Sequence, residues 1–171
     1  GSTGDNISMS MEEQKMIMKS IIDFVDHRVP VYPGTGRYST AQTIELSKYA
    51  QECGAEGVLV IMPYYLQPHK RAVVNHFRKL REAIDIDIIL SNRFCGYEMT
   101  PLEIKEMVDE GLINGIKAAH GDANRIHELK YYCGDKLTVL YGHDYAPMEG
   151  FLAGADGWLS GMPAIFPKFA R

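Results

Sequence analysis

The chain has 171 residues, 46% of them hydrophobic and 23% charged, which is ordinary for a globular protein with a substantial core. A formal net charge of −4 gives no electrostatic reason to expect a nucleic acid or an acidic membrane as a partner. No apolar run approaches the roughly 20 residues of a membrane span, and the odd number of cysteines, without metal-ligand spacing, favours a reducing cytoplasm and no bound metal.

The first predicted helix covers residues 10–25. Ser10 and Glu13 are spaced as a capping box, in which each side chain satisfies a backbone N–H group of the first turn. Four more helices are predicted over residues 39–53, 69–84, 100–111 and 122–134. The amphipathic pattern of the first helix comes from apolar residues along one face, namely Ile17, Ile21, Phe24 and Val25.

Short apolar runs rich in Val, Ile and Leu alternate with these helices. They read as buried parallel strands, and there are six of them, at residues 29–33, 57–62, 86–90, 113–117, 137–141 and 157–161. A strand–helix repeat of about 25 residues predicts βαβ units with right-handed crossovers. The fold class is therefore α/β.

Two α/β architectures fit this alternation: an open doubly wound sheet and a (β/α)₈ barrel. Both place their chemistry at the carboxyl ends of the strands, where the reactive side chains of this sequence fall. No GxGxxG motif follows a strand, which weakens the nucleotide-binding version. The segment "PGTGRYST" (residues 33–40) is a glycine-bearing turn into a helix that could cradle an anion.

One lysine ends a predicted strand, in the segment "INGIKAAHGD" (residues 113–122). Charged side chains rarely lie in such apolar surroundings without a partner. The head of Lys117 can reach solvent or an internal carboxylate. Alternatively, burial favours its neutral amine, which can attack a ketone and form a Schiff base. From the residues alone, both interpretations stay open.

Four motifs in the same order resemble the dihydrodipicolinate synthase / N-acetylneuraminate lyase family of class I, Schiff-base lyases. "GSTGD" (residues 1–5) is similar to the family's GTTGE carboxylate-binding loop, and "GVLVIMPYY" (residues 57–65) to its GVLVVTPYY. "GIKAAHGD" (residues 115–122) matches the segment with the Schiff-base lysine, and "AGADGWLS" (residues 153–160) matches the approach to the last barrel strand.

The resemblance implies a TIM barrel and a lyase that forms an imine between Lys117 and pyruvate or a related 2-oxo acid, without a cofactor. The resemblance implies three kinds of reaction: aldol cleavage, aldol condensation or dehydration. One plausible branch is a dehydratase or aldolase that acts on 2-oxo-3-deoxy sugar acids. Tyr65 would join a hydroxyl relay, often across a subunit contact in this family, which implies a homo-oligomer. The implied substrate contacts are Ser2 and Thr3 for the carboxylate, with Gly142 and Leu159 along the pocket.

Three positions depart from the family pattern. Ser91 stands where the family has its proton-donating tyrosine, and the shortened loop after it keeps Arg93 as its cation. The family's Gly-Asp pair reads Gly142-His143. Two replacements for the missing tyrosine are open: Tyr97, on the shortened loop, could swing its phenol inward, or a water could bridge from Ser91. We favour Tyr97, because the shortened loop brings it nearer the strand end.

Further residues follow strands. His120 and His143 lie where they could reach the pocket, and Asp144 is expected to cap a helix. Since "GSTG" belongs at the end of the second barrel strand, residues 1–171 are expected to form a single partial barrel domain with strands 3 to 8. Two other functions stay open: a non-catalytic relative that binds 2-oxo acids, motivated by Ser91, and a doubly wound protein that binds a phosphate-bearing ligand at residues 33–40.

Overall fold

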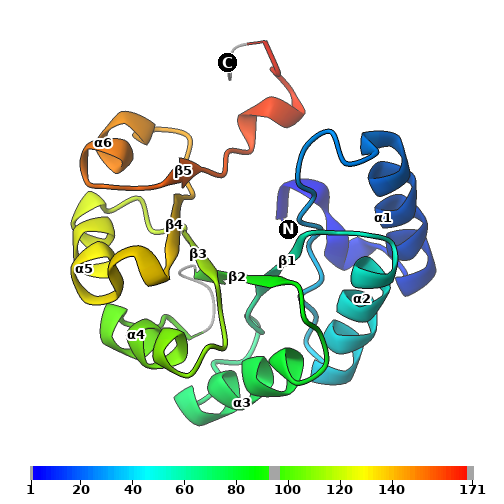
Figure 1. The fold of residues 1–171 in the computed structure, drawn as a ribbon, viewed down its shortest axis with the longest axis horizontal. Coiled ribbons are helices and arrows are strands. Elements are labelled where there is room, and N and C mark those ends of the chain that lie inside the picture. Colours follow the sequence, from blue (N-terminus) through cyan, green and yellow to red (C-terminus); the bar gives the residue numbers. More distant parts are fainter. Residues whose placement is uncertain (1, 93–96, 169–171) are drawn as a thin grey trace.

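Five parallel strands form one sheet, in chain order, in the computed structural model of the protein, which describes residues 2–92 and 97–168 apart from the Ser2 side chain. The ribbon in Figure 1 curves into an arc, with the strands on its inner side and the helices outside. The strands are β1 (Gly57–Ile61), β2 (Asp87–Asn92), β3 (Gly115–Ala118), β4 (Thr138–Tyr141) and β5 (Gly157–Trp158).

The helices begin largely where the sequence predicts them. At the start of α1 (Met11–Val25) the Ser10 Oγ accepts a hydrogen bond from the Glu13 N–H, and the Glu13 carboxylate accepts one from the Ser10 N–H, so the predicted capping box is confirmed. The others are α2 (Thr40–Glu52), α3 (Lys70–Arg81), α4 (Pro101–Asp109), α5 (Ala123–Cys133) and α6 (Pro147–Leu152), with short 3₁₀ turns η1 (Ser2–Gly4), η2 (Asn6–Ser8), η3 (Gly134–Lys136) and η4 (Met162–Ala164).

The strand order decides between the two predicted architectures. Neighbours in the sheet are consecutive in the sequence, and every pairing is parallel. A doubly wound sheet reverses its order at a switch point and carries helices on both faces, whereas a barrel keeps sequential order with helices outside. The barrel class is confirmed, and the doubly wound alternative with its phosphate-binding function is wrong.

The first predicted strand is not formed. Residues 29–33 lead only to a single parallel bridge between Gly34 and Leu59. Pro30 and Pro33 have no N–H group to donate to a ladder, and the N–H of Val31 donates to the Glu56 carboxylate at 2.7 Å. The described sheet therefore has five strands where the sequence predicts six.

Helix α1 buries a different face from the apolar one noted in the sequence. Met18 and Ile22 enter the core, whereas Ile21 and Phe24 are exposed, Phe24 to 77%. The buried face also contains Gln14, whose Nε2 donates to the Gly34 carbonyl at 2.7 Å. The hydrogen-bonded side chain of Gln14 thus lies on the buried face of α1, and the apolar side chains of Ile21 and Phe24 remain exposed.

Candidate active site

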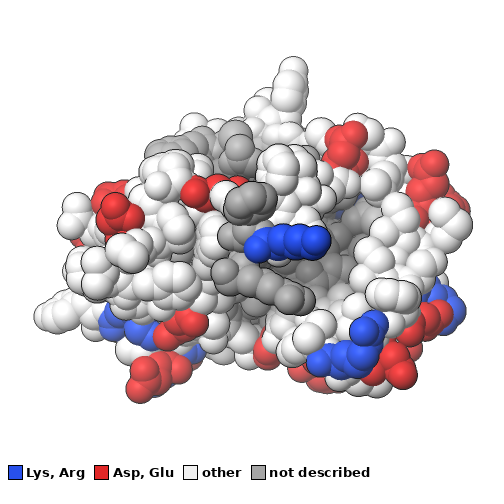
Figure 2. All heavy atoms as spheres, turned by 90° about the horizontal axis from the view of Figure 1, so that it is seen from above, with Lys and Arg blue, Asp and Glu red and all other residues white. Residues whose placement is uncertain are grey.

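A cavity of about 180 Å³ lies at the carboxyl ends of the strands. The end of each of the first three strands contributes to its wall, through Ile61, Ser91 and Lys117, and Gly142 follows β4. On the side of the molecule that Figure 2 shows, at 90° to the view of Figure 1, acidic and basic side chains are interspersed. The position agrees with that of ligand sites in β/α barrels.

Lys117 and Ser91 occupy paired positions on the adjacent strands β3 and β2. Paired residues of a parallel ladder point to the same face of a sheet, and both side chains line the cavity. Ser91 is buried and Lys117 is partly buried. Among the described lining residues, Lys117 is the one lysine or arginine. An amine and a hydroxyl therefore stand side by side at the cavity.

Gly142 leaves room for the lysine. A Cβ atom at this position would lie 2.9 Å from both Cγ and Cε of Lys117, and 3.0 Å from the Ala118 carbonyl oxygen. The backbone cannot easily move aside, because the Gly142 N–H donates to that same oxygen at 3.0 Å. Any side chain here would displace Lys117.

Two short turns bring the beginning of the chain to the cavity, where Thr3 of η1 and Asn6 of η2 line the wall. Between the two turns, Asp5 adopts a left-handed conformation with φ of 50°. Thr3 lies near the far edge of the sheet, since a Cβ atom on Gly161 would be 3.3 Å from the Thr3 Oγ1. Segments from the two ends of the chain meet at this cavity.

A polar clamp holds the N-terminal segment in place. The Arg37 guanidinium donates to the Met9 carbonyl at 3.0 Å and to the Gln14 Oε1 at 2.5 and 3.1 Å. Gln14 in turn donates to the Gly34 carbonyl. Arg37, which belongs to the "PGTGRYST" segment, therefore holds residues 9–14, which follow η2, in place.

Two predicted site residues do not line the cavity in the described part of the chain. Tyr65 is 82% exposed. The backbone N–H of Leu159 donates to the Tyr141 carbonyl at 2.9 Å, just after β5. The Ser2 side chain and the whole of Arg93 lie outside the described residues.

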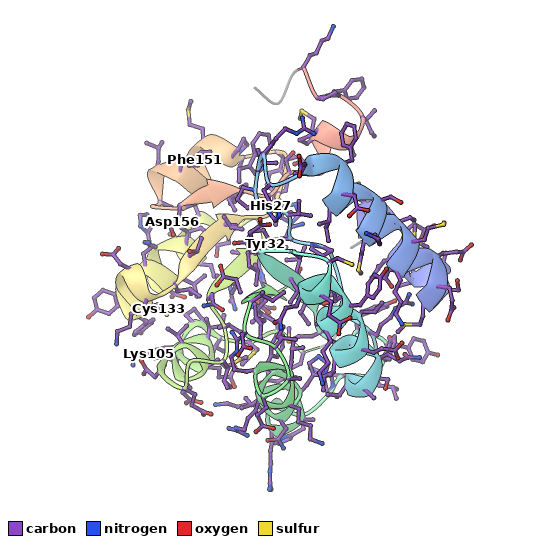
Figure 3. All side chains as sticks on the ribbon, turned by 45° about the vertical axis from the view of Figure 1, so that its right-hand side comes forward. His27, Tyr32, Lys105, Cys133, Phe151 and Asp156 are labelled. Carbon is purple, nitrogen blue, oxygen red and sulfur yellow. The ribbon has the colours of Figure 1, made fainter. Side chains whose placement is uncertain are left out.

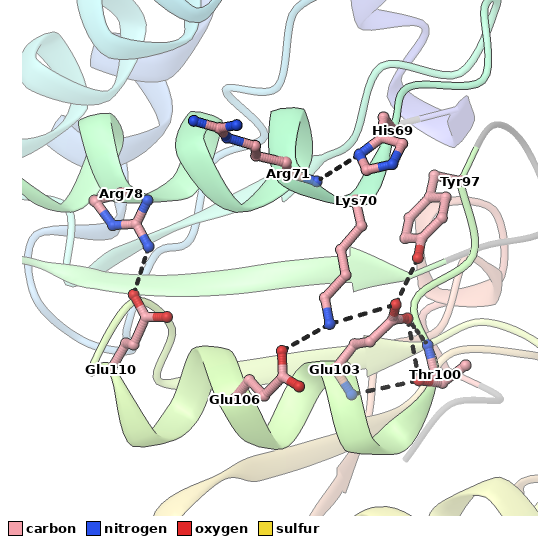
Figure 4. Close-up of polar contacts among 9 residues, drawn as sticks. All are labelled: His69, Lys70, Arg71, Arg78, Tyr97, Thr100, Glu103, Glu106 and Glu110. Carbon is pink, nitrogen blue, oxygen red and sulfur yellow. Dashed lines mark hydrogen bonds and ion pairs between the residues drawn. The ribbon is translucent and has the colours of Figure 1, made fainter.

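The inward swing expected of Tyr97 is wrong. Its hydroxyl donates to the Glu103 Oε1 at 2.6 Å, and the side chain does not line the described cavity (Figure 4). Glu103 is a fixed acceptor, because its other oxygen belongs to the capping box at Thr100. This hydrogen bond, with burial and the Glu103 charge, raises the pKa of Tyr97.

Asp144 is a cavity residue rather than the expected helix cap. Its Oδ1 accepts hydrogen bonds from the Ser160 Oγ at 2.6 Å and from the Gly161 N–H at 3.2 Å. Helix α6 is preceded by Ala146 at the capping position instead. Sequence reasoning missed this role because it depends on a contact between two loops.

The two histidines differ. His143 lines the cavity, and its Nε2 lies 2.9 Å from the Ala119 carbonyl, so this nitrogen carries the proton. The His120 Nε2 lies 3.1 Å from the Glu98 carboxylate, which Arg125 also contacts at 3.1 Å. Burial lowers the pKa of His120, and the Arg125 charge lowers it further. This cluster joins the segment before α4 to the start of α5, and His120 is not among the described lining residues.

In residues 2–92 and 97–168, no three His, Cys, Asp or Glu side chains gather as metal ligands would. No helix of this part of the chain is long and apolar enough to cross a membrane.

The fold and the cavity define the class of protein: an arc of a β/α barrel whose site, at the carboxyl ends of its strands, pairs a lysine with a hydroxyl. The chain matches the Dihydrodipicolinate synthetase family over residues 1–171. It belongs to that family.

Relatives with the name 4-hydroxy-tetrahydrodipicolinate synthase are similar along almost the whole chain. Those of Clostridium perfringens strain 13 and Geobacter metallireducens are 36% and 37% identical to it over 170 residues. These matches cover 98% of this chain but 58% and 59% of the relatives. The chain thus spans less than two thirds of the length of these relatives.

The fold of this chain also matches solved structures over a similar part of their length. The chloride-inhibited dihydrodipicolinate synthase from Acinetobacter baumannii, complexed with pyruvate, matches with a TM-score of 0.93 and 35% identity. A prophage protein of the dihydrodipicolinic acid synthase family from E. coli K12, also in complex with pyruvate, matches with a TM-score of 0.92 and 33% identity. Both matches cover 98% of this chain and 58% of the other chain.

Proposed function

We propose that the protein is a Schiff-base-forming lyase acting on pyruvate or a related 2-oxo acid, by aldol cleavage, condensation or dehydration. The observation that carries this proposal is the pairing of Lys117 with Ser91 at one cavity, where Gly142 leaves the lysine room. Membership of the family and similarity to two structures complexed with pyruvate support it.

Lys117 would supply the nucleophile. Its neutral Nζ attacks C2 of the oxo acid, and loss of water leaves a carbon–nitrogen double bond in place of the carbonyl. The protonated imine then accepts the electron pair of the C3–C4 bond as an enamine, while the C4 hydroxyl loses its proton and becomes a carbonyl. Ser91 is the neighbouring hydroxyl that passes protons, and Thr3, with the Ser2 segment, holds the carboxylate.

Tyr65 and Leu159 would have different roles in the proposed reaction. With 82% of its surface exposed, Tyr65 would complete the hydroxyl relay of a neighbouring subunit, in a homo-oligomer. Its neighbour Leu66 is exposed too, as a residue at a subunit contact would be in an isolated chain. Leu159 would contact the oxo acid through its backbone.

Reduction of the imine tests the proposal. The chain is incubated with pyruvate and borohydride, and its intact mass is measured. We expect the mass of a reduced adduct for the unchanged chain and for Lys48→Met, a matched substitution at an exposed lysine of α2. Lys117→Met should give none. An adduct that persists in Lys117→Met, or the lack of any adduct with several 2-oxo acids, would contradict the proposed function.

A further inference from the structure

Asn6 presents an unsatisfied hydrogen-bond donor at the cavity wall. Its side chain is only 8% exposed and lines the cavity. Its Nδ2 is buried, and no described residue accepts a hydrogen bond from it. Leaving a buried amide donor unpaired is unfavourable, and nearly all such groups in proteins have a partner. An oxygen of a bound ligand would supply the missing acceptor.

The place of Asn6 within the cavity shows which part of a ligand it faces. It lies on the β1 side, because it also lines a neighbouring groove with Tyr32, Pro33 and Gly34. The cavity wall on that side is otherwise formed by glycines and apolar residues, namely Gly34, Gly36, Leu59 and Ile61.

Thr3 lies toward another part of the cavity wall, near the residues that follow β5. It approaches Gly161, beyond β5, and Asp144 lies at the same glycine. If C2 of an oxo acid is joined to Lys117 and its carboxylate faces Thr3, the remaining carbons extend away from Thr3. That direction leads toward Asn6.

We propose that Asn6 is a specificity-determining residue, which binds a hydroxyl group beyond C3 of the 2-oxo acid. The inference rests on the proposed function and adds the chemistry of the second half of the substrate. A carboxamide both donates and accepts, which suits a hydroxyl. A site with a buried polar group discriminates against analogues that lack its partner, because the group then stays unpaired.

Two oxo acids with the same carbon skeleton test this role. 4-Hydroxy-2-oxobutanoate has a hydroxyl on C4, and 2-oxobutanoate has none. The concentration of each that gives half-maximal borohydride trapping is measured by intact mass. We expect the unchanged chain to prefer the hydroxylated acid by about three- to tenfold, the value of one neutral hydrogen bond.

Asn6→Leu should remove this preference and leave trapping of 2-oxobutanoate and pyruvate unchanged. Asn124→Leu, at an exposed position of α5, is the matched control and should keep the preference. The melting temperature of Asn6→Leu should not fall, because an unpaired buried donor is replaced by an apolar group of similar size. If the leucine variant does not fold, Asn6→Ala is compared in the same way.

The outcomes separate this inference from the proposed function. Adducts with an unchanged preference in Asn6→Leu would overturn the role of Asn6 alone. Equally weakened trapping of all three acids would assign Asn6 to the shared carboxylate, and would also overturn the role. If the unchanged chain forms no adduct with any of them, the proposed function and the inference fall together.

Discussion

The hydroxyl beside Lys117 belongs to a serine, which differs from the implied tyrosine in both reach and acidity. A phenol has a pKa near 10, and an aliphatic hydroxyl is a weaker acid. No other described hydroxyl replaces it from the loop, because the Tyr97 phenol donates to Glu103 and Lys70 approaches the same carboxylate at 3.7 Å. Under the proposed function, we therefore expect proton transfer at the amine to depend on Ser91.

Paired substitutions distinguish these two hydroxyls. Ser91→Ala should slow imine formation by roughly 10²-fold, the low end of the effect of positioned proton transfer. Tyr97→Phe should leave this rate unchanged, and should lower the free energy of unfolding by about 1 kcal/mol through the lost hydrogen bond. Timed borohydride quenching and denaturant unfolding measure the two effects. A larger slowing by Tyr97→Phe than by Ser91→Ala would show that the loop moves inward.

Sequence reasoning located some cavity residues and missed others for a physical reason. Lys117 ends a predicted strand, where a local pattern fixes its place, and the family resemblance implied Gly142 at the pocket. Asn6 and Asp144 line the cavity because loops far apart in the sequence come together. A local pattern contains no information about such contacts.

Among the secondary-structure elements, α5, β4 and the turn before β5 are joined by the carboxylate of Asp156, a residue labelled in Figure 3. The Asp156 side chain accepts a hydrogen bond from the Val139 N–H at 2.8 Å, and Lys130 contacts it at 2.9 and 3.1 Å. Burial raises the pKa of Asp156, but the Val139 hydrogen bond and the Lys130 ammonium together outweigh it, so that the pKa is lowered.

Because the pKa of Asp156 is lower in the folded than in the unfolded state, its charge stabilises the fold at pH values above the pKa of the unfolded state. This stabilisation is lost as the pH falls through the pKa of the folded state. Asp156→Asn should therefore lower the melting temperature at pH 7. The difference from the unchanged chain should shrink as the pH falls below about 4, the ordinary pKa of an aspartate, and vanish once Asp156 is protonated. Asp23→Asn, at an exposed pair on α1, is the control and should have little effect. A difference that is constant over this range would contradict the role of the charge.

Helix boundaries were predictable because the capping signals are local, as Ser10 and Thr100 show. The buried face of α1 was not, since Gln14 is buried only through its contacts with Gly34 and Arg37. The sequence of residues 29–33, where the predicted strand does not form, contains features that disfavour a strand. Its two prolines cannot donate ladder hydrogen bonds, and apolar content alone does not reveal this.

On the scale of the whole molecule, an apolar surface remains at the edge of the arc beside α1. Ile17 and Ile21 are exposed there, and they line a groove with Val31, Tyr32 and Pro33. Contiguous exposed apolar surface of this kind is unusual and binds apolar molecules.

This groove should bind the dye ANS. The double substitution Ile17→Gln with Ile21→Gln should reduce the fluorescence of bound dye, and should change the free energy of unfolding by no more than about 0.5 kcal/mol, as for exposed sites. Leu102→Gln, on the exposed side of α4, is the control, because it lies outside the described groove. Equal dye binding by all three proteins would place the apolar surface elsewhere.

The approach of Thr3 to Gly161 has a consequence for affinity. Thr3 and Gly161 are far apart in the sequence, so the wall they complete exists only when both of their segments are docked. Docking of each segment is a local equilibrium with its own free energy of opening. The apparent affinity for any ligand is reduced by the fraction of molecules in which either segment is undocked. Local opening of either segment therefore sets an upper limit on how tightly the cavity between them can bind.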